Sequence, residues 1–308
     1  MPSLQHTLFR FTTLQMRYSV DMHLSQVPRI RKLLEISSIP LYLPLGVSAR
    51  LLRIGDLLAE WYTPRKADPK LVLLYLHGGG YCVGSILTHR GLVARLAQEA
   101  GIQAMQIDYR LAPEHPFPAA LEDAVHAYQW LLQQGYEAHQ ILLAGDSAGG
   151  GLAVALQLTL REMGLPLPVA TLYFSPWVDI RFSTDSARTY ATSDPIIHVA
   201  EVAGWGEAYA GSYPLDHPMI SPVLADLTGL PPALIQASDS EVLTDDARML
   251  QQGYARYGST CELQLWPEML HVWQMFWRMI PEAKQAIAQG ADFLRQQGLA
   301  ARNRQAAA

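Results

Sequence analysis

The pentapeptide Gly145-Asp146-Ser147-Ala148-Gly149 is the strongest chemical signal in the chain. The apolar run Ile-Leu-Leu-Ala precedes it and a helix-forming segment follows, so we expect Ser147 on a sharp turn between a strand and a helix. Small neighbours are needed there because the backbone is too crowded for side chains. The positive end of the following helix favours a developing negative charge. The pattern predicts a nucleophilic serine, and an ordinary glycine-rich turn is the alternative.

A second signal is the run His77-Gly78-Gly79-Gly80-Tyr81, directly after an apolar stretch. Successive glycines let backbone N–H groups converge on one point, where they can hold an oxyanion. A flexible connection between a strand and a helix is the alternative interpretation. We expect His77 to brace this loop rather than to transfer a proton.

Three motifs in this order resemble the hormone-sensitive-lipase family of α/β-hydrolase esterases. They are HGGG at 77–80, DYRLAPE at 108–114 with PFPA at 116–119, and GDSAGG at 145–150. The resemblance extends from about residue 47 to 295. It implies an α/β-hydrolase fold, a serine carboxylesterase that acts on short- to medium-chain acyl esters through an acyl-enzyme, and no cofactor.

The resemblance also implies roles for individual residues. Backbone amides of Gly79, Gly80 and Ala148 are expected to form the oxyanion hole. In the middle motif, Arg110 and Glu114 are expected to pair and brace the loops.

A serine hydroxyl needs a base and an orienting carboxylate to attack at neutral pH. This fold orders its triad as serine, acid, histidine. His271 follows the last predicted strand, which is where the hormone-sensitive-lipase family has its catalytic histidine. His198 and His217 lie in or beside a predicted insertion. His271 is therefore the predicted base.

The predicted acid lies after the strand expected at 233–237. Matching Leu243 and the acidic pair that follows it to the family pattern puts Glu241 in the acid's place, where Asp is commoner. Glu also serves in α/β-hydrolase triads. Asp239 is the rival, and Asp245 and Asp246 are expected to begin the next helix.

The elements that position these residues follow a repeating rhythm of short apolar runs and helix-length segments. Strands are expected at 71–76, 103–107, 141–144, 169–174, 233–237 and 261–266, and helices at 88–101, 118–134 and 147–162, with further helices after the last two strands. This alternation predicts an α/β fold with a mostly parallel sheet covered by helices on both faces.

Residues 179–212 interrupt the rhythm and are too many for a simple loop. We interpret 1–45 and 179–212 as the two parts of a helical cap, and 46–178 with 213–308 as the catalytic domain. Tyr81, Trp205 and Tyr209 are candidates for substrate binding, although Trp205 and Tyr209, which lie in the cap, could instead hold the cap on the body.

The first 53 residues contain seven basic and two acidic side chains, within a chain of net charge -5. A helix capped by Ser25 is expected there, with its apolar positions at Val27, Ile30, Leu33 and Leu34. Its basic face could meet a lipid surface or the acidic body of the protein, and a solvated face is the simpler interpretation.

The composition excludes several classes of protein. Hydrophobic residues make up 50% and charged residues 17% of 308 residues, which is typical of a globular protein. The acidic balance argues against nucleic acid as a partner. Cys82 and Cys261 are too few for a disulfide framework or a zinc ribbon, and no metal-ligand motif occurs. We expect Cys82 to be a small buried residue, with sensitivity to thiol reagents as the alternative.

The apolar run 39–47 is too short and too rich in proline to span a bilayer, and the start of the chain does not resemble a secretory signal. We therefore expect a cytoplasmic protein. The resemblance also allows a homodimer through the segments after 261–266. Two other functions remain open. The same machinery could cleave an amide, thioester or lactone, or the fold could serve as a small-molecule receptor.

Overall fold

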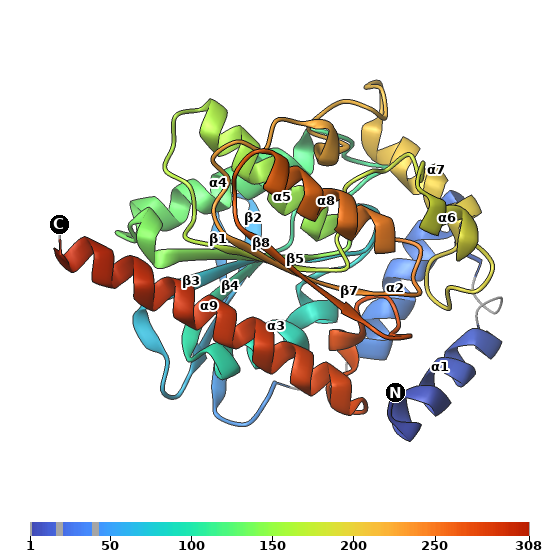
Figure 1. Ribbon diagram of the computed structural model, residues 1–308, viewed down its shortest axis with the longest axis horizontal. Helices are drawn as coiled ribbons and strands as arrows, with labels where there is room; N and C mark the ends of the chain where they lie inside the picture. Colours follow the sequence, from blue (N-terminus) through green and yellow to red (C-terminus); the bar gives the residue numbers. More distant parts are fainter. Residues whose placement is uncertain (1, 17–20, 39–42, 308) are drawn as a thin grey trace.

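A computed structural model describes residues 2–16, 21–38 and 43–307. It contains an eight-stranded sheet between two layers of helices (Figure 1). Residues 39–42 of the predicted apolar run lie outside the described residues, as do residues 17–20 of the predicted cap. None of the helices in the described ranges is long and apolar enough to cross a membrane.

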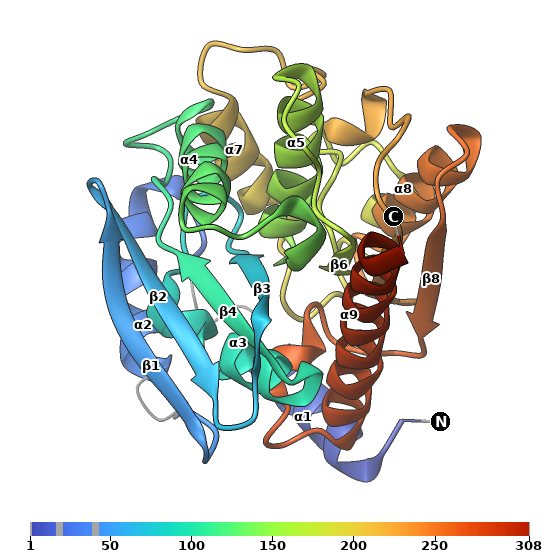
Figure 2. The ribbon, with the colours of Figure 1, turned by 90° about the vertical axis from the view of Figure 1, so that its left-hand side faces the viewer.

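The strands lie in the order β1-β2-β4-β3-β5-β6-β7-β8. β2 runs antiparallel to both of its neighbours, and every pair from β4 to β8 is parallel. Figure 2 shows β1 and β2 at one edge of the sheet and β8 at the other. The strands are β1 (Val47–Ile54), β2 (Leu57–Pro64), β3 (Asp68–Leu76), β4 (Ile102–Ile107), β5 (Ile141–Asp146), β6 (Thr171–Phe174), β7 (Ala233–Ser238) and β8 (Cys261–Trp266).

The six predicted strands and the mostly parallel sheet are confirmed. The hairpin of β1 and β2 was not predicted from the sequence. β1 is half-exposed, with an irregular burial pattern, so it lacks the continuous apolar run of the inner strands. The turn Gly55-Asp56 between two extended segments was the signal that could have revealed it.

Helices cover both faces of the sheet. α3 and α9 contact each other on one face, and α4, α5 and α8 lie on the other (Figure 1). Alternate residues of β3 enter the two cores, with Leu71 and Tyr75 beneath α3 and α9 and Val72 and Leu76 on the opposite side. The helices are α3 (Ile86–Ala100), α4 (Ala119–Gln133), α5 (Ala148–Glu162), α8 (Thr244–Arg256) and α9 (Pro281–Ala307), with 3-10 turns η3 (Ala138–Gln140), η4 (Pro222–Leu224) and η5 (Trp273–Phe276).

The predicted insertion contains α6 (Asp185–Thr189) and α7 (Val199–Ala210). The N-terminal part contains α1 (Leu4–Met16), η2 (Leu24–Gln26) and α2 (Val27–Ser38), at the same end of the molecule (Figure 1). The two parts meet at Met22, whose carbonyl accepts a hydrogen bond from Trp205 Nε1 at 2.9 Å. Met22 N–H donates to Glu201 Oε2 at 3.1 Å. The division into cap and catalytic domain stays a prediction.

The helix expected near Ser25 begins two residues later, at Val27, because Ser25 lies in η2. Val27 and Ile30 are buried, whereas Leu33 and Leu34 are exposed. α2 faces the body of the protein through Arg31. Its guanidinium donates to the carbonyls of Cys82 and Ala112 and to Glu114, and each of these contacts measures 2.7–3.0 Å.

The expected pairing of Arg110 with Glu114 is wrong. Arg110 Nε donates to Asp123 at 3.0 Å, and its Nη2 donates to Glu122 at 2.9 Å. α4 begins at Ala119 and brings both of these carboxylates beneath the guanidinium within its first turns. Glu114 instead pairs with Arg31, with Nη2 and Oε2 2.8 Å apart.

Candidate active site

Ser147 lies between β5 and α5 with φ 50° and ψ -123°, which is an uncommon backbone conformation for a residue with a side chain. The chain is tightly packed around it. A Cβ at Gly145 would lie 2.3 Å from the carbonyl oxygen of Gly149, and a Cβ at Gly149 would lie 2.1 Å from that of Leu76. The strand and the helix can therefore meet at this angle only if positions 145 and 149 are both glycine.

The loop after β3 passes beside this turn. Gly79 has φ +118° and Gly80 has φ +59°. A Cβ on Gly79 would lie 2.2 Å from the carbonyl oxygen of Val83, and one on Gly80 would lie 2.7 Å from a ring carbon of Trp205. Ala148 is the first residue of α5, and N–H groups in the first turn of a helix have no acceptor within the helix.

His77 opens this loop and is fully buried. Its Nδ1 lies 2.8 Å from the carbonyl oxygen of Gly78, and its ring stacks on Tyr109 with centroids 4.2 Å apart. Burial, with the neighbouring His89, lowers the pKa of His77 to about 3. A histidine that stays neutral and stacks inside the fold braces the loop, as expected from the sequence. Cys82 is also buried, and burial raises the pKa of its thiol to about 12.

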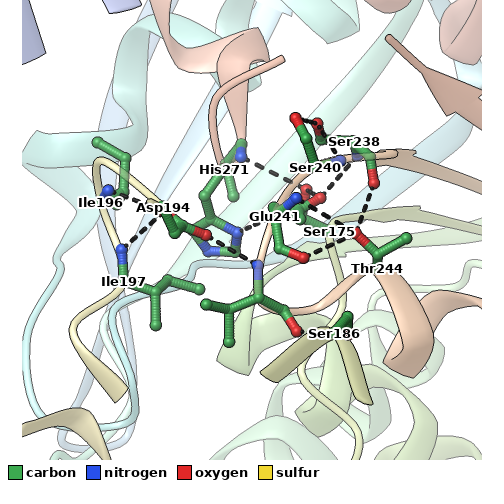
Figure 3. Close-up of polar contacts among 12 residues, drawn as sticks. Ser175, Ser186, Asp194, Ile196, Ile197, Ser238, Ser240, Glu241, Thr244 and His271 are labelled. Carbon is green, nitrogen blue, oxygen red and sulfur yellow. Dashed lines mark hydrogen bonds and ion pairs between the residues drawn. The ribbon is translucent and has the colours of Figure 1, made fainter. Parts of the chain in front are cut away.

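His271 and Glu241 form a buried pair, with Nδ1 of the histidine 2.6 Å from Oε2 of the glutamate (Figure 3). Burial alone would lower the pKa of His271. The hydrogen bond and charge of Glu241, together with the charges of Asp194 and Asp146, raise it above its ordinary value. The raised pKa makes the imidazole of His271 a better proton acceptor than a free histidine.

Glu241 is held on its other oxygen by two donors. Both the hydroxyl of Ser175 and the backbone N–H of Ser238 donate to Oε1 at 2.7 Å (Figure 3). The rival acid, Asp239, is half-buried and accepts a hydrogen bond from the N–H of Glu268 at 2.7 Å. Of the two carboxylates considered from the sequence, Glu241 is the one that contacts His271.

A cavity of about 250 Å³ brings the predicted groups together. Its lining includes Ser147, His271, Gly79 and Gly80, and the rest of its wall is mainly apolar. His198 and His217 lie elsewhere, the first 3.3 Å from Glu201 and the second against Phe117. Among the described residues, no cluster of three or more His, Cys, Asp or Glu side chains could hold a metal ion.

The three aromatic candidates for substrate binding occupy different places. Trp205 lines the cavity. Tyr81 and Tyr209 are buried and stack on each other with ring centroids 3.6 Å apart, and neither is among the described residues that line the cavity. The stack joins α7 to the glycine loop, and Trp205 remains a substrate-binding candidate.

Sequence reasoning missed two polar residues at this site, Ser175 and Asp194. Ser175 directly follows β6, and polar residues at the carboxyl ends of parallel strands are a known signal for sites in α/β folds. Asp194 precedes a proline in the insertion, where its local sequence predicts only a turn. Its contact with the loop that carries Glu241 depends on the tertiary structure.

Comparisons with known proteins identify the family. A model of the α/β-hydrolase fold matches residues 73–275. An acetyl-hydrolase of Streptomyces hygroscopicus is 44% identical over 242 residues, which cover 79% of this chain and 81% of the relative. An esterase of Acinetobacter venetianus is 33% identical over 248 residues, which cover 80% of this chain and 82% of the relative.

The crystal structure of an esterase from the bacterial hormone-sensitive lipase family matches with a TM-score of 0.91 at 40% identity. The match covers 96% of this chain and 99% of that chain. Fold and relatives together define an α/β-hydrolase that cleaves carboxylic esters. The chain belongs to the hormone-sensitive-lipase family of these esterases.

Proposed function

We propose that the protein is a serine carboxylesterase that hydrolyses short- to medium-chain acyl esters through an acyl-enzyme intermediate. One observation carries the proposal. Ser147 and His271 line the same cavity, and Nδ1 of His271 lies 2.6 Å from Oε2 of Glu241. A nucleophile, a base and an orienting carboxylate in this order are what acyl transfer by serine requires.

In the first half of the reaction, Ser147 Oγ attacks the carbonyl carbon of the ester while His271 Nε2 takes its proton. Glu241 keeps the proton of the imidazole on Nδ1 and stabilises the imidazolium. The amides of Gly79, Gly80 and Ala148 hold the oxyanion, in a site where such donors contribute strongly because water is excluded. His271 then protonates the departing alcohol, which leaves the acyl group on Ser147.

In the second half, a water molecule takes the place of the alcohol. His271 removes a proton from the water, and the hydroxide attacks the acyl-enzyme carbonyl. The same amides stabilise the second oxyanion. Collapse of this intermediate returns the proton from His271 to Ser147 and releases the carboxylic acid.

The cavity supports a limit on the size of the substrate. Its volume of about 250 Å³ and its apolar wall suit a small acyl group better than a long chain. Trp205 on α7 and Leu34 on α2 both contribute to the wall, so the two predicted parts of the cap together cover the substrate. One of the relatives is called an acetyl-hydrolase, which is consistent with a short acyl group.

Mass spectrometry of the intact protein after treatment with an organophosphonate serine probe tests the proposal, with the Ser147→Ala variant beside it. We expect one adduct, mapped to Ser147 and absent from the variant. The same variant should lose about 10⁶ in kcat on a p-nitrophenyl ester, which is the order of loss in a serine hydrolase whose nucleophilic serine is removed. A folded Ser147→Ala protein with the wild-type esterase rate would disprove the mechanism.

A further inference from the structure

The carboxylate of Asp194 bridges two segments that are far apart in the sequence. Its Oδ1 accepts hydrogen bonds from the N–H groups of Ile196 at 2.8 Å and Ile197 at 3.0 Å. Its Oδ2 accepts from the N–H of Val242 at 2.9 Å. Asp194 is 0% exposed, and its contacts with Ile196, Ile197 and the loop of Glu241 are drawn in Figure 3.

The two segments that Asp194 joins lie at different parts of the candidate site. Ile196 and Ile197 line the cavity, so they contact whatever occupies it. Val242 directly follows Glu241, the residue that binds His271. A carboxylate that accepts backbone N–H groups forms charge-assisted hydrogen bonds, which are roughly twice as strong as neutral ones. One buried side chain therefore holds both a wall of the cavity and the backbone of the loop that carries Glu241. We call this loop, residues 239–243, the acid loop.

Two other residues of the insertion, Tyr190 and Ser186, also contact the acid loop, but they are not among the described residues that line the cavity. The hydroxyl of Tyr190 donates to the carbonyl of Asp239 at 3.0 Å, and Ser186 Oγ donates to the carbonyl of Val242 at 2.8 Å. These contacts attach the insertion to the loop. Asp194 adds the link from the loop to the cavity wall.

Asp194 also contributes to the field at His271. The charged groups that act on this imidazole come from three elements: Glu241 from the loop after β7, Asp194 from the insertion, and Asp146 from the end of β5. All three favour the protonated form, against burial, which disfavours it. Removal of the charge at Asp194 leaves Glu241 in place and weakens the attraction for a proton on His271.

We propose that Asp194 is a positioning residue that couples the cavity wall to the Glu241–His271 pair. It sets the shape of the acyl site through Ile196 and Ile197, and it sets the placement of Glu241 through the peptide of Val242. The inference rests on the proposed function, since it takes His271 as the base.

The test uses Asp194→Asn, which keeps the shape but replaces one accepting oxygen with an NH2 group. At least one of the three N–H groups then loses its acceptor. We expect kcat/KM to fall roughly tenfold, in line with the loss of one buried hydrogen bond to a charged group. We also expect the acidic limb of the pH–rate profile to move to lower pH, and the ratio of rates on p-nitrophenyl acetate and hexanoate to change.

The matched control is Asp185→Asn, at an exposed carboxylate of the same insertion that pairs with Arg188. We expect the control to retain wild-type rates, pH profile and acyl-chain ratio. Circular dichroism and thermal unfolding confirm that each variant is folded. A folded Asp194→Asn protein with the wild-type pH limb and acyl-chain ratio would overturn the inference.

Asp194→Glu is the second variant, and it serves alone if Asp194→Asn does not fold. It keeps the charge and displaces the carboxylate by one methylene, so the pH limb should stay and the acyl-chain ratio should change. An unchanged ratio would overturn the inference. The organophosphonate probe distinguishes failure of the proposed function from failure of the inference about Asp194. An unlabelled Ser147 in the wild type refutes the proposed function, whereas a labelled Ser147 with unaltered Asp194 variants refutes the coupling alone.

Discussion

The carboxylate of Asp146 and the backbone N–H of Gly78 form a 3.0 Å hydrogen bond that joins the turn of the serine to the glycine loop. The same oxygen accepts from the hydroxyl of Tyr75 at 2.8 Å, and the other oxygen faces His89 Nε2 at 3.3 Å. Burial would raise the pKa of Asp146, but the charge and hydrogen bond of His89, with the hydroxyl of Tyr75, lower it. A charged carboxylate thus holds the serine turn and the glycine loop together.

Replacement of Asp146 by Ala should therefore damage both stability and catalysis. It leaves the N–H of Gly78 and the hydroxyl of Tyr75 buried without an acceptor, and each such group costs about 1–3 kcal/mol. We expect the free energy of unfolding in urea to fall by roughly 3 kcal/mol, and kcat to fall about 10²-fold as the oxyanion loop shifts. Asp292→Ala, at an exposed ion pair with Arg295, is the control and should change stability by less than about 0.5 kcal/mol.

The two candidate acids can be ranked by paired substitutions. Glu241→Gln keeps the volume of the side chain but removes the charge that holds the correct tautomer of His271. We expect kcat to fall by about 10⁴, as in other serine hydrolases with this change. Asp239→Asn should retain kcat within about threefold, because Asp239 binds the N–H of Glu268 rather than the histidine. Steady-state kinetics on one p-nitrophenyl ester decide the order, and the opposite ranking would reassign the acid.

The pH dependence of kcat/KM follows from the raised pKa of His271. The base must be neutral in order to take the proton of Ser147, so activity is lost as pH falls through that pKa. Because Glu241 raises it above the ordinary value of 6.5, the midpoint of the acidic limb should lie above pH 6.5. Glu241→Gln should move the midpoint to lower pH, since the neutral amide no longer favours the imidazolium. A midpoint that stays fixed in this variant would exclude His271 as the titrating group.

The glycine loop allows a test of the oxyanion hole with a matched control. A methyl group at Gly79 would lie 2.2 Å from the carbonyl oxygen of Val83, so Gly79→Ala must displace the loop. We expect a 10²–10³-fold loss in kcat, similar to the loss of one oxyanion donor elsewhere. Gly229 also has positive φ, +75°, but a Cβ there would meet no described atom within 4 Å. Gly229→Ala should cost some stability and leave kcat unchanged, and equal losses of kcat in both variants would argue against an oxyanion role.

Much of the fold could be predicted because the inner strands are continuous apolar runs, and such runs indicate strands covered on both faces. β1 could not, since it is half-exposed and lies at the edge of the sheet, beside β2. The predicted pairing of Arg110 with Glu114 was wrong because the partner of each charge depends on the tertiary structure. Residues four apart meet on a helix, whereas 110–114 is irregular, and the partner of each charge comes from another helix.

The serine turn and the glycine loop could be recognised because their chemistry depends on neighbouring residues in the sequence. The surroundings of Glu241 depend on tertiary contacts. Ser175 reaches it across 66 residues of the chain, and Asp194 reaches the peptide of Val242 across 48. Nothing in the local sequence around either residue indicates its partner. A resemblance to a family can suggest which carboxylate is the acid, but the groups that hold it became visible only in the folded structure.

The contacts between the insertion and the acid loop have a consequence for how substrate enters and product leaves. If residues 186–194 swung outward as a hinged cover, the hydrogen bonds to Asp239 and Val242 would break and the support of Glu241 would be lost with them. We therefore expect substrate and product to pass through another part of the cavity wall. Met22 and Leu34 of the N-terminal segment also line the cavity, and neither belongs to the segment that contacts the acid loop. We therefore expect the N-terminal segment, rather than the insertion, to move when substrate enters and product leaves.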